Sequence, residues 1–179
     1  AIRKVVQDKP YVVIGSPPCT YFSSLMRLNW DKMDPWEAEE RWSEAIQHLN
    51  FCVQIYRLQS KEGRYFLHEH PLGASSWKMP SIEEVLKKQG AIRTRAHQCA
   101  YKHEGTDSEG AGLVFKPTAF LTNAPFLAER LQRKCTNSGN KEKHRHVHLV
   151  NGRAKKAQVY PPELCREICE GIRDQKRHD

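Results

Sequence analysis

Residues 11–23 read Tyr11-Val-Val-Ile-Gly-Ser-Pro-Pro-Cys-Thr-Tyr-Phe-Ser23. The run at 11–14 is apolar and rich in β-branched residues, which predicts a short buried strand. Gly15 and the two prolines that follow end the strand, because proline has no N–H for a sheet ladder and stiffens the backbone before it. Cys19 is therefore expected just past the carboxyl end of a strand, where open α/β sheets place their ligands and their chemistry.

Two interpretations of Cys19 are open on these residues. A thiol that is held rigidly in one place suits a nucleophile. A free cysteine is also commonly buried as a small apolar side chain, so a structural role after a proline turn is the other interpretation.

A long helix and a second strand follow. Pro35 stands at a typical first helical position after an aspartate N-cap, and apolar residues three and four apart predict a helix over residues 35–60. The next strand begins at residues 65–67 and ends in a turn near Glu69. This order predicts a βαβ unit, so Cys19 and Glu69 should lie at the same edge of the sheet. We expect an α/β fold with a partial Rossmann-like, mostly parallel sheet that is flanked by helices.

The rest of the chain shows shorter patterns. We expect helices over 82–88 and 126–134, a strand over 92–101, and a strand or hairpin arm over 113–122. We also expect a flexible loop over 105–112, a hairpin-type turn at 151–152, a last helix from residue 161 or 162, and a fraying tail over 173–179.

Composition limits the class of protein. The 179 residues suffice for one domain, 1–179, and the formal net charge of +8 favours a polyanionic partner, most plausibly nucleic acid, or simply good solubility. No apolar run approaches the ~20 residues of a membrane span, and the first residues lack the apolar region of a secretory signal. The chain has no initiator Met, which suggests a fragment. Its six cysteines are scattered, so we expect a reducing nucleus or cytoplasm.

A basic, histidine-rich loop is expected over 136–148. Cys135, His144, His146 and His148 are candidate zinc ligands, and alternation places the three histidines on one side of an extended segment. The spacing is not that of a standard zinc finger, and the alternative is a solvated basic loop that contacts phosphate.

Several short motifs resemble those of DNA cytosine-5 methyltransferases. Ser16-Pro-Pro-Cys19 with a following Phe-Ser pair resembles the family's catalytic loop. Arg64-Tyr-Phe-Leu-His-Glu-His-Pro71 resembles its glutamate motif, with His70 where asparagine is usual. The order Pro-Pro-Cys-Thr, Glu-His-Pro, Lys-Pro-Thr, His-X-His and Tyr-Pro-Pro is similar to methyltransferase-like domains of retroelement polyproteins and of phage-type relatives, and it covers most of the chain.

The resemblance implies a role for several side chains. Cys19 would add to cytosine C6, and a protonated Glu69 would bind N3 of a base that has left the DNA duplex. Arg93 or Arg95 would hold the O2 carbonyl, although the family's Gln-X-Arg-X-Arg motif is not cleanly present. The further residues implied are Ser16, Pro18 and Ser23 for substrate, and Pro17 and Val159 for the methyl donor, S-adenosylmethionine.

One expected feature is absent. The family binds its donor with a glycine-rich turn after a first strand, and only ~10 residues precede the strand at 11–14, too few for such a unit. The alternative function is a degenerate, non-catalytic nucleic-acid-binding domain of a retroelement polyprotein, possibly stabilised by zinc.

Overall fold

The expected βαβ unit is the framework of the fold, which we describe from a computed structural model for residues 1–23, 26, 30–88, 90–137, 143–150 and 152–179. Strand β1 (Val12–Gly15) pairs in parallel with β2 (Tyr65–Pro71), and helix α3 (Pro35–Lys61) connects them. The Asp34 carboxylate caps α3, accepting the backbone N–H groups of Trp36 at 3.0 Å and Glu37 at 3.1 Å. The helix, its cap and the parallel pair are confirmed.

The remaining elements follow in chain order. They are α1 (Ile2–Asp8), the 3-10 turns η1 (Thr20–Phe22), η2 (Trp30–Lys32), η3 (Ser75–Lys78) and η4 (Gln98–Tyr101), helices α4 (Pro80–Lys88), α5 (Pro125–Arg130), α6 (Arg153–Lys156) and α7 (Pro162–His178), and strands β3 (Ile92–His97), β4 (Glu104–Asp107), β5 (Gly110–Val114), β6 (Pro117–Thr122) and β7 (His146–Val147).

The main sheet is mixed rather than mostly parallel. Its strand order is β1-β2-β6-β3, and β6 is antiparallel to both of its neighbours. The chain returns from β3 through η4 and the β4–β5 hairpin, without a helical crossover, and such a return leads to antiparallel pairing. The mixed α/β class is confirmed, while a Rossmann-like, mostly parallel sheet is not.

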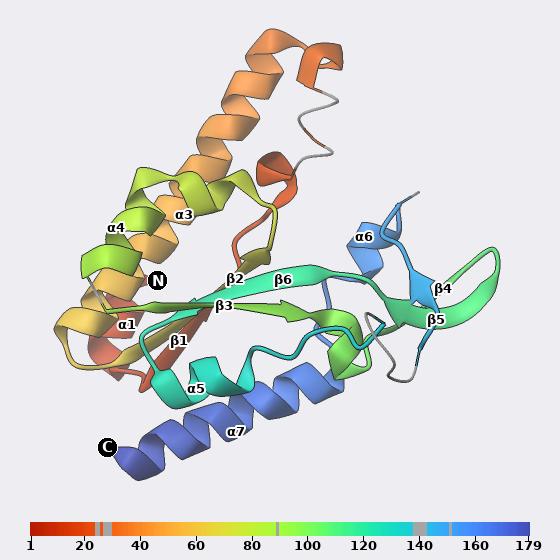
Figure 1. Cartoon of the computed structure of the whole chain (residues 1–179). Helices are drawn as coiled ribbons and strands as arrows, with labels where there is room; N and C mark the ends of the chain where they lie inside the picture. The colour runs from red at the N-terminus through yellow and green to blue at the C-terminus, as the bar shows by residue number, and fades with distance from the viewer. Residues whose placement is uncertain (24–25, 27–29, 89, 138–142, 151) are drawn as a thin grey trace.

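Helices cover both faces of this sheet (Figure 1). Helices α3 and α4 pack on one face over a cluster that includes Leu49, Tyr56 and Phe66. Helices α5 and α7 pack on the other face over a cluster that includes Phe120 and Leu164. The two clusters are the hydrophobic cores that fix the sheet between its helical layers.

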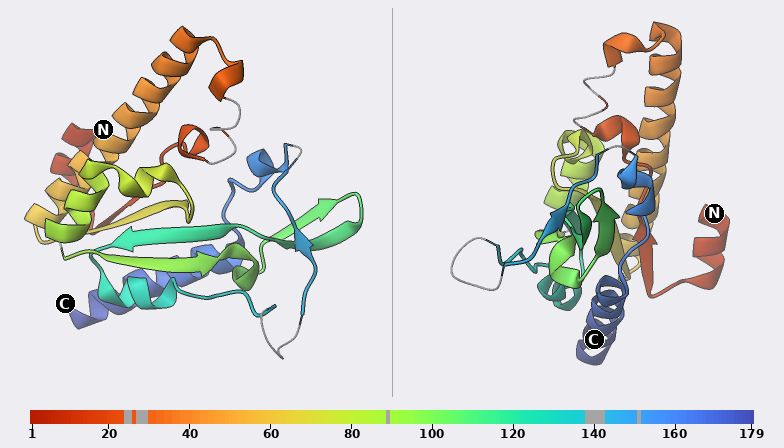
Figure 2. Two further views of the ribbon diagram at one scale, coloured as in Figure 1. Left: turned by 45° about the horizontal axis from the view of Figure 1, so that its top comes forward. Right: turned by 90° about the vertical axis from the view of Figure 1, so that its right-hand side faces the viewer.

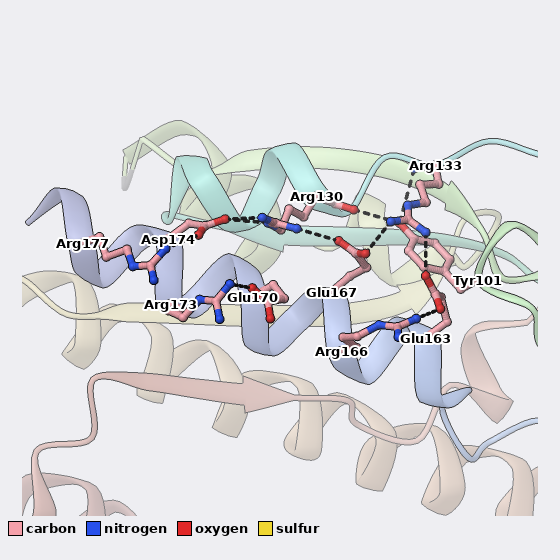
Figure 3. Close-up of polar contacts among 10 residues, drawn as sticks. All are labelled: Tyr101, Arg130, Arg133, Glu163, Arg166, Glu167, Glu170, Arg173, Asp174 and Arg177. Atoms are coloured by element: carbon pink, nitrogen blue, oxygen red, sulfur yellow. Dashed lines mark hydrogen bonds and ion pairs between the residues drawn. The ribbon is translucent and has the colours of Figure 1, made fainter.

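Ion pairs join α7 to the end of α5 (Figure 3). Arg130 contacts Asp174 at 2.6 Å and Glu167 at 3.1 Å, and Arg133 contacts Glu163 at 3.1 Å. These charges are partly exposed, so their contribution to stability is modest. They do show that much of the positive charge on this side is locally balanced.

The expected fraying of residues 173–179 is wrong, because α7 continues to His178. The carboxylate of Asp179 accepts the hydroxyl groups of Tyr11 at 2.6 Å and Tyr65 at 2.8 Å. These contacts, from the residue before β1 and from the first residue of β2, hold a segment that the sequence pattern alone left unattached.

A second, three-stranded sheet lies at one end of the main sheet (Figure 2). Its order is β4-β5-β7, with β4 and β5 antiparallel and β5 and β7 parallel. The loop expected over 105–112 is therefore a β-hairpin. The strand expected over 92–101 ends at His97 and becomes η4. Of the expected turn at 151–152, Asn151 lies outside the described residues, and Gly152 has a φ of 80° before α6.

Two buried histidines on β2 should make the fold sensitive to acid. Burial lowers the pKa of His68 well below its ordinary value, and burial lowers the pKa of His70 as well. Below pH 6.5 the unfolded chain gains protons that the folded chain does not hold, so the free energy of unfolding should fall by up to about 1.4 kcal/mol per pH unit for each histidine. Denaturant unfolding between pH 7.5 and 5.5 measures this slope.

The matched variants are His68→Gln and His48→Gln, since His48 is exposed on α3. We expect the first to flatten the pH dependence and the second to leave it unchanged. An equal slope in wild type and His68→Gln would contradict the assignment.

Candidate functional site

The segment that carries Cys19 is held from both ends. Phe22 in η1 is buried in the cluster beneath α3, and the carbonyl of Pro17 accepts a hydrogen bond from His70 Nε2 at 2.9 Å. A carbonyl only accepts, so Nε2 carries the proton and Nδ1 accepts the Ser76 hydroxyl at 2.6 Å. His70 thus fixes the backbone two residues before Cys19.

Glu69 is a buried carboxylate on β2 with an exposed fraction of 4%. Its Oε2 accepts the hydroxyl groups of Ser16 at 2.8 Å and Tyr160 at 3.2 Å. Its Oε1 lies 3.8 Å from Lys116 Nζ and, among the described residues, has no hydrogen-bond partner. Hydroxyl donors therefore surround Oε2, while the buried Oε1 lies next to the Lys116 ammonium group.

Cys19 and Glu69 line one cleft of about 440 Å³. The residues that form it come from the β1 loop, the end of β2, the segment between β5 and β6 and the segment before α7. They are Ile14, Ser16, Pro17, Pro18, Cys19, Thr20, Glu69, Lys116, Gln158 and Tyr160. The tertiary structure brings the thiol and the carboxyl group to a common cavity, and their catalytic roles stay a prediction.

The cleft keeps the Cys19 thiol protonated at rest. Burial raises the pKa of Cys19, and the negative charge of Glu69 raises it further. The Lys116 ammonium group acts in the opposite direction and is the one cation among the lining residues. A nucleophilic thiolate would thus have to form during the reaction rather than before it.

The other residues expected at the site divide into two groups. Ser16, Pro17 and Pro18 line the cleft. Ser23 is not among the lining residues, and its hydroxyl group accepts the backbone N–H of Met26 at 3.2 Å. Val159 is 75% exposed and borders a neighbouring hollow.

Arg93 and Arg95 lie on the wrong face of the sheet for the role expected of them. Residues that pair across strands share a face, and Arg93 is in register with Leu121, which pairs with His68. Glu69 pairs with Phe120 and points to the opposite face. The Arg93 guanidinium group instead packs 4.2 Å above the Trp77 ring, a cation–π contact.

Sequence reasoning missed Lys116, Gln158 and Tyr160. Lys116 and Tyr160 belong to the Lys-Pro-Thr and Tyr-Pro-Pro motifs, which mark the resemblance without indicating what their side chains contact. Burial, followed by the charge of Glu69, raises the pKa of Tyr160, so its hydroxyl group stays protonated and donates to the carboxylate.

Nothing among the described residues supports S-adenosylmethionine. A donor site of this kind needs a glycine that leaves room for the ligand where a strand turns into a helix. Gly15 ends β1, but the space beside it is filled, since an added Cβ would lie 2.0 Å from the Tyr56 hydroxyl oxygen. We derive no step through the methyl donor.

A separate cluster of metal-ligating side chains lies beside the second sheet. Single ligand atoms of Cys99, Cys135, His144 and His146 all lie within 4.8 Å of one another, so the cluster could hold a metal ion. Three of the four candidates expected from the histidine-rich loop are present, although residues 138–142 of that loop lie outside the described part. His148 is not in the cluster and packs on the ring of Phe115.

Cys99 is the cluster member that the sequence pattern did not indicate. It lies in η4, thirty-six positions before Cys135, and no short motif connects the two. Because η4 directly follows strand β3, the position of β3 in the main sheet places Cys99 beside the histidine-rich loop.

The site therefore belongs to a mixed α/β domain with a cysteine-containing cleft and a separate Cys/His cluster. The chain matches no family model, no curated protein and no solved structure. Within the described ranges, no helix has both the length and the apolar character that a membrane crossing requires.

Proposed function

We propose that this domain binds nucleic acid at the Cys19 cleft and that the Cys19 thiol adds to C6 of an extruded cytosine. The observation that carries the proposal is the shared cleft, in which the thiol lines the same cavity as a buried carboxyl group that pairs with Lys116. The nature of the base follows from the resemblance to cytosine-5 methyltransferases, as does S-adenosylmethionine, to which we assign no step.

The chemistry balances as a conjugate addition. The S–H bond of Cys19 breaks and an S–C6 bond forms. The C5–C6 and C4–N3 double bonds become one C4–C5 double bond, and a proton is added at N3. Glu69 is the group placed to carry that proton, because its carboxyl group lines the same cleft as the thiol. The step is neutral overall, since the proton that leaves sulfur is the one that N3 gains.

Two exposed lysines that lie close in sequence to the cleft offer positive charge for phosphate groups. Helix α6 precedes the lining residues Gln158 and Tyr160 and carries Lys155 and Lys156, which are both exposed. In the part of the chain that the structure describes, neither lysine forms an ion pair. Uncompensated lysines beside a cavity suit a nucleic-acid backbone, whose contacts are largely electrostatic.

Reversible addition at C6 makes C5 exchange its hydrogen with solvent, without any methyl donor. We expect the protein to catalyse deuterium uptake at C5 in a cytosine-containing single-stranded oligonucleotide in D2O, measured by mass spectrometry. Cys19→Ser should reduce the uptake to the level of protein-free buffer, while the exposed-cysteine control Cys169→Ser should retain it. Equal exchange by Cys19→Ser and wild type would exclude the proposed nucleophile.

A second candidate function has an observation in its favour. The raised pKa of Cys19 is also what a structural cysteine would show, so the alternative is a degenerate retroelement domain that binds nucleic acid without reacting. It predicts oligonucleotide binding by wild type and Cys19→Ser alike, with no deuterium uptake by either.

A further inference from the structure

We propose that Cys99, Cys135, His144 and His146 bind one structural zinc ion that fastens the three-stranded sheet to the main sheet. The ligands come from separate parts of the fold: Cys99 from η4 after β3, Cys135 from the segment after α5, His144 from the residues before β7, and His146 from β7 itself. A single ion would therefore connect η4, which lies 36 positions earlier in the chain, to the segment after α5 and to β7.

The separations between ligand atoms suit tetrahedral zinc. Zn–S bonds of about 2.3 Å and Zn–N bonds of about 2.0–2.1 Å place sulfur and nitrogen about 3.6 Å apart at the tetrahedral angle. Cys135 Sγ lies 3.4 Å from His146 Nε2 and 3.7 Å from His144 Nε2. The two Nε2 atoms are 2.9 Å apart, so the imidazole rings would separate by about 0.5 Å to reach ideal geometry.

The donor set selects the metal. Two thiolates and two imidazoles favour zinc over magnesium or calcium, which prefer oxygen ligands. The cluster contains no carboxylate, and all four positions of a tetrahedron are filled by the protein, as in structural rather than catalytic sites.

A second layer of hydrogen bonds holds the ligands in place. The backbone N–H of Asn137 donates to Cys135 Sγ at 3.4 Å, which supports a thiolate. The Asn137 side chain accepts from the backbone N–H of His144 at 2.9 Å and donates to its carbonyl at 2.7 Å. The backbone N–H of Cys135 donates to His97 Nδ1 at 3.0 Å.

The small sheet needs such a support. Neither hydrophobic cluster of the protein includes a residue of β4, β5 or β7. Among the described residues of these strands, only Val114 and Val147 are buried apolar side chains. A sheet with so little core is typically stabilised by a metal or a disulfide, and metal binding then contributes directly to folding.

The metal would also position one wall of the cleft. The Phe115 ring lies 4.8 Å from the ring of His146, and the Phe115 N–H donates to the carbonyl of Val147 at 3.0 Å. The next residue is Lys116, whose ammonium group lies 3.8 Å from Glu69. The zinc site stands on its own geometry, and it does not depend on whether Cys19 reacts.

The primary test is zinc content. The whole chain, purified with zinc and freed of excess metal, should hold about one ion per chain by elemental analysis. Cys99→Ser and Cys135→Ser should each lose most of it, while the matched controls His148→Asn and Cys169→Ser should keep it. Content well below one ion in wild type, or equal loss in His148→Asn, would overturn the assignment.

Cobalt substitution in the wild-type chain keeps the test valid if the cysteine variants do not fold. Tetrahedral Co²⁺ with two thiolates should give intense visible bands and a sulfur-to-cobalt charge-transfer band. Removal of the metal with a chelator should lower Tm and expose the β4–β5 hairpin to proteolysis. A cobalt spectrum without the charge-transfer band, or a chelated protein with unchanged Tm, would refute the site.

Discussion

Gly15→Ala is expected to lower the free energy of unfolding by about 3 kcal/mol, the upper part of the range for overpacking a core. An alanine Cβ would lie 2.0 Å from the hydroxyl oxygen and 2.9 Å from Cζ of Tyr56. Tyr56 has little room to withdraw, because it is fully buried, stacks on Phe66 with ring centroids 4.6 Å apart and shares a 2.9 Å hydrogen bond with His68. Either the tyrosine or β1 must shift.

Denaturant unfolding measures this loss, and Gly73→Ala is the matched control. An added Cβ at Gly73 would meet no atom within 4 Å, and its φ is not positive, so this change should be nearly neutral. A folded Gly15→Ala protein with wild-type stability would show that Tyr56 does not fill this space. Because Gly15 leads into the Cys19 loop, the substitution should also alter the reactivity of that thiol.

The second large effect concerns the reactivity of the Cys19 thiol, which two substitutions should change in opposite directions. The charge of Glu69 raises the pKa of Cys19, so Glu69→Gln should lower it and increase the thiolate fraction at pH 7.5. Lys116 lowers the pKa of Cys19, so Lys116→Met should raise it and decrease that fraction. Each change should alter the rate of alkylation roughly threefold to tenfold, since one pKa unit is about a tenfold change in thiolate.

The rates can be followed at Cys19 alone by alkylation with iodoacetamide, digestion and mass spectrometry of its peptide. Glu129→Gln is the control, because Glu129 is exposed on α5 and does not line the cleft. This substitution removes the same charge at a different place. Slower alkylation of Glu69→Gln would contradict the electrostatic coupling. Equal rates in all four proteins would show that access, rather than charge, limits the reaction.

Local sequence chemistry predicted the scaffold of the cleft well. The strand before Gly15, the Asp34 cap and the helix that follows are each specified by neighbours along the chain. The expected burial of that strand is wrong, because β1 is the edge strand of the main sheet and Ile14 is 52% exposed. These features sufficed to place Cys19 and Glu69 near one sheet edge, because parallel strands end together.

The pairing of strands that are far apart in the sequence could not be predicted from local patterns in the same way. Whether β6 enters the sheet parallel or antiparallel depends on how residues 98–114 return, and that is decided by packing rather than by pattern. The register then places Arg93 opposite Leu121 and so on the face away from Glu69. A shift of one residue would have reversed this, which is why alternation along a strand does not reveal its face.

By itself the sequence determined the strand that ends at Gly15, the rigid approach to Cys19, the capped helix α3 and the parallel pair that follows, because these depend on backbone restrictions and on contacts between near neighbours. Only the tertiary structure decided that Lys116 and Tyr160 join Glu69, and that Cys99 completes the cluster in place of His148. Those contacts connect residues tens of positions apart. They form when the strands pair in one register and the helical layers and the small sheet pack against the main sheet, and no local pattern encodes that arrangement.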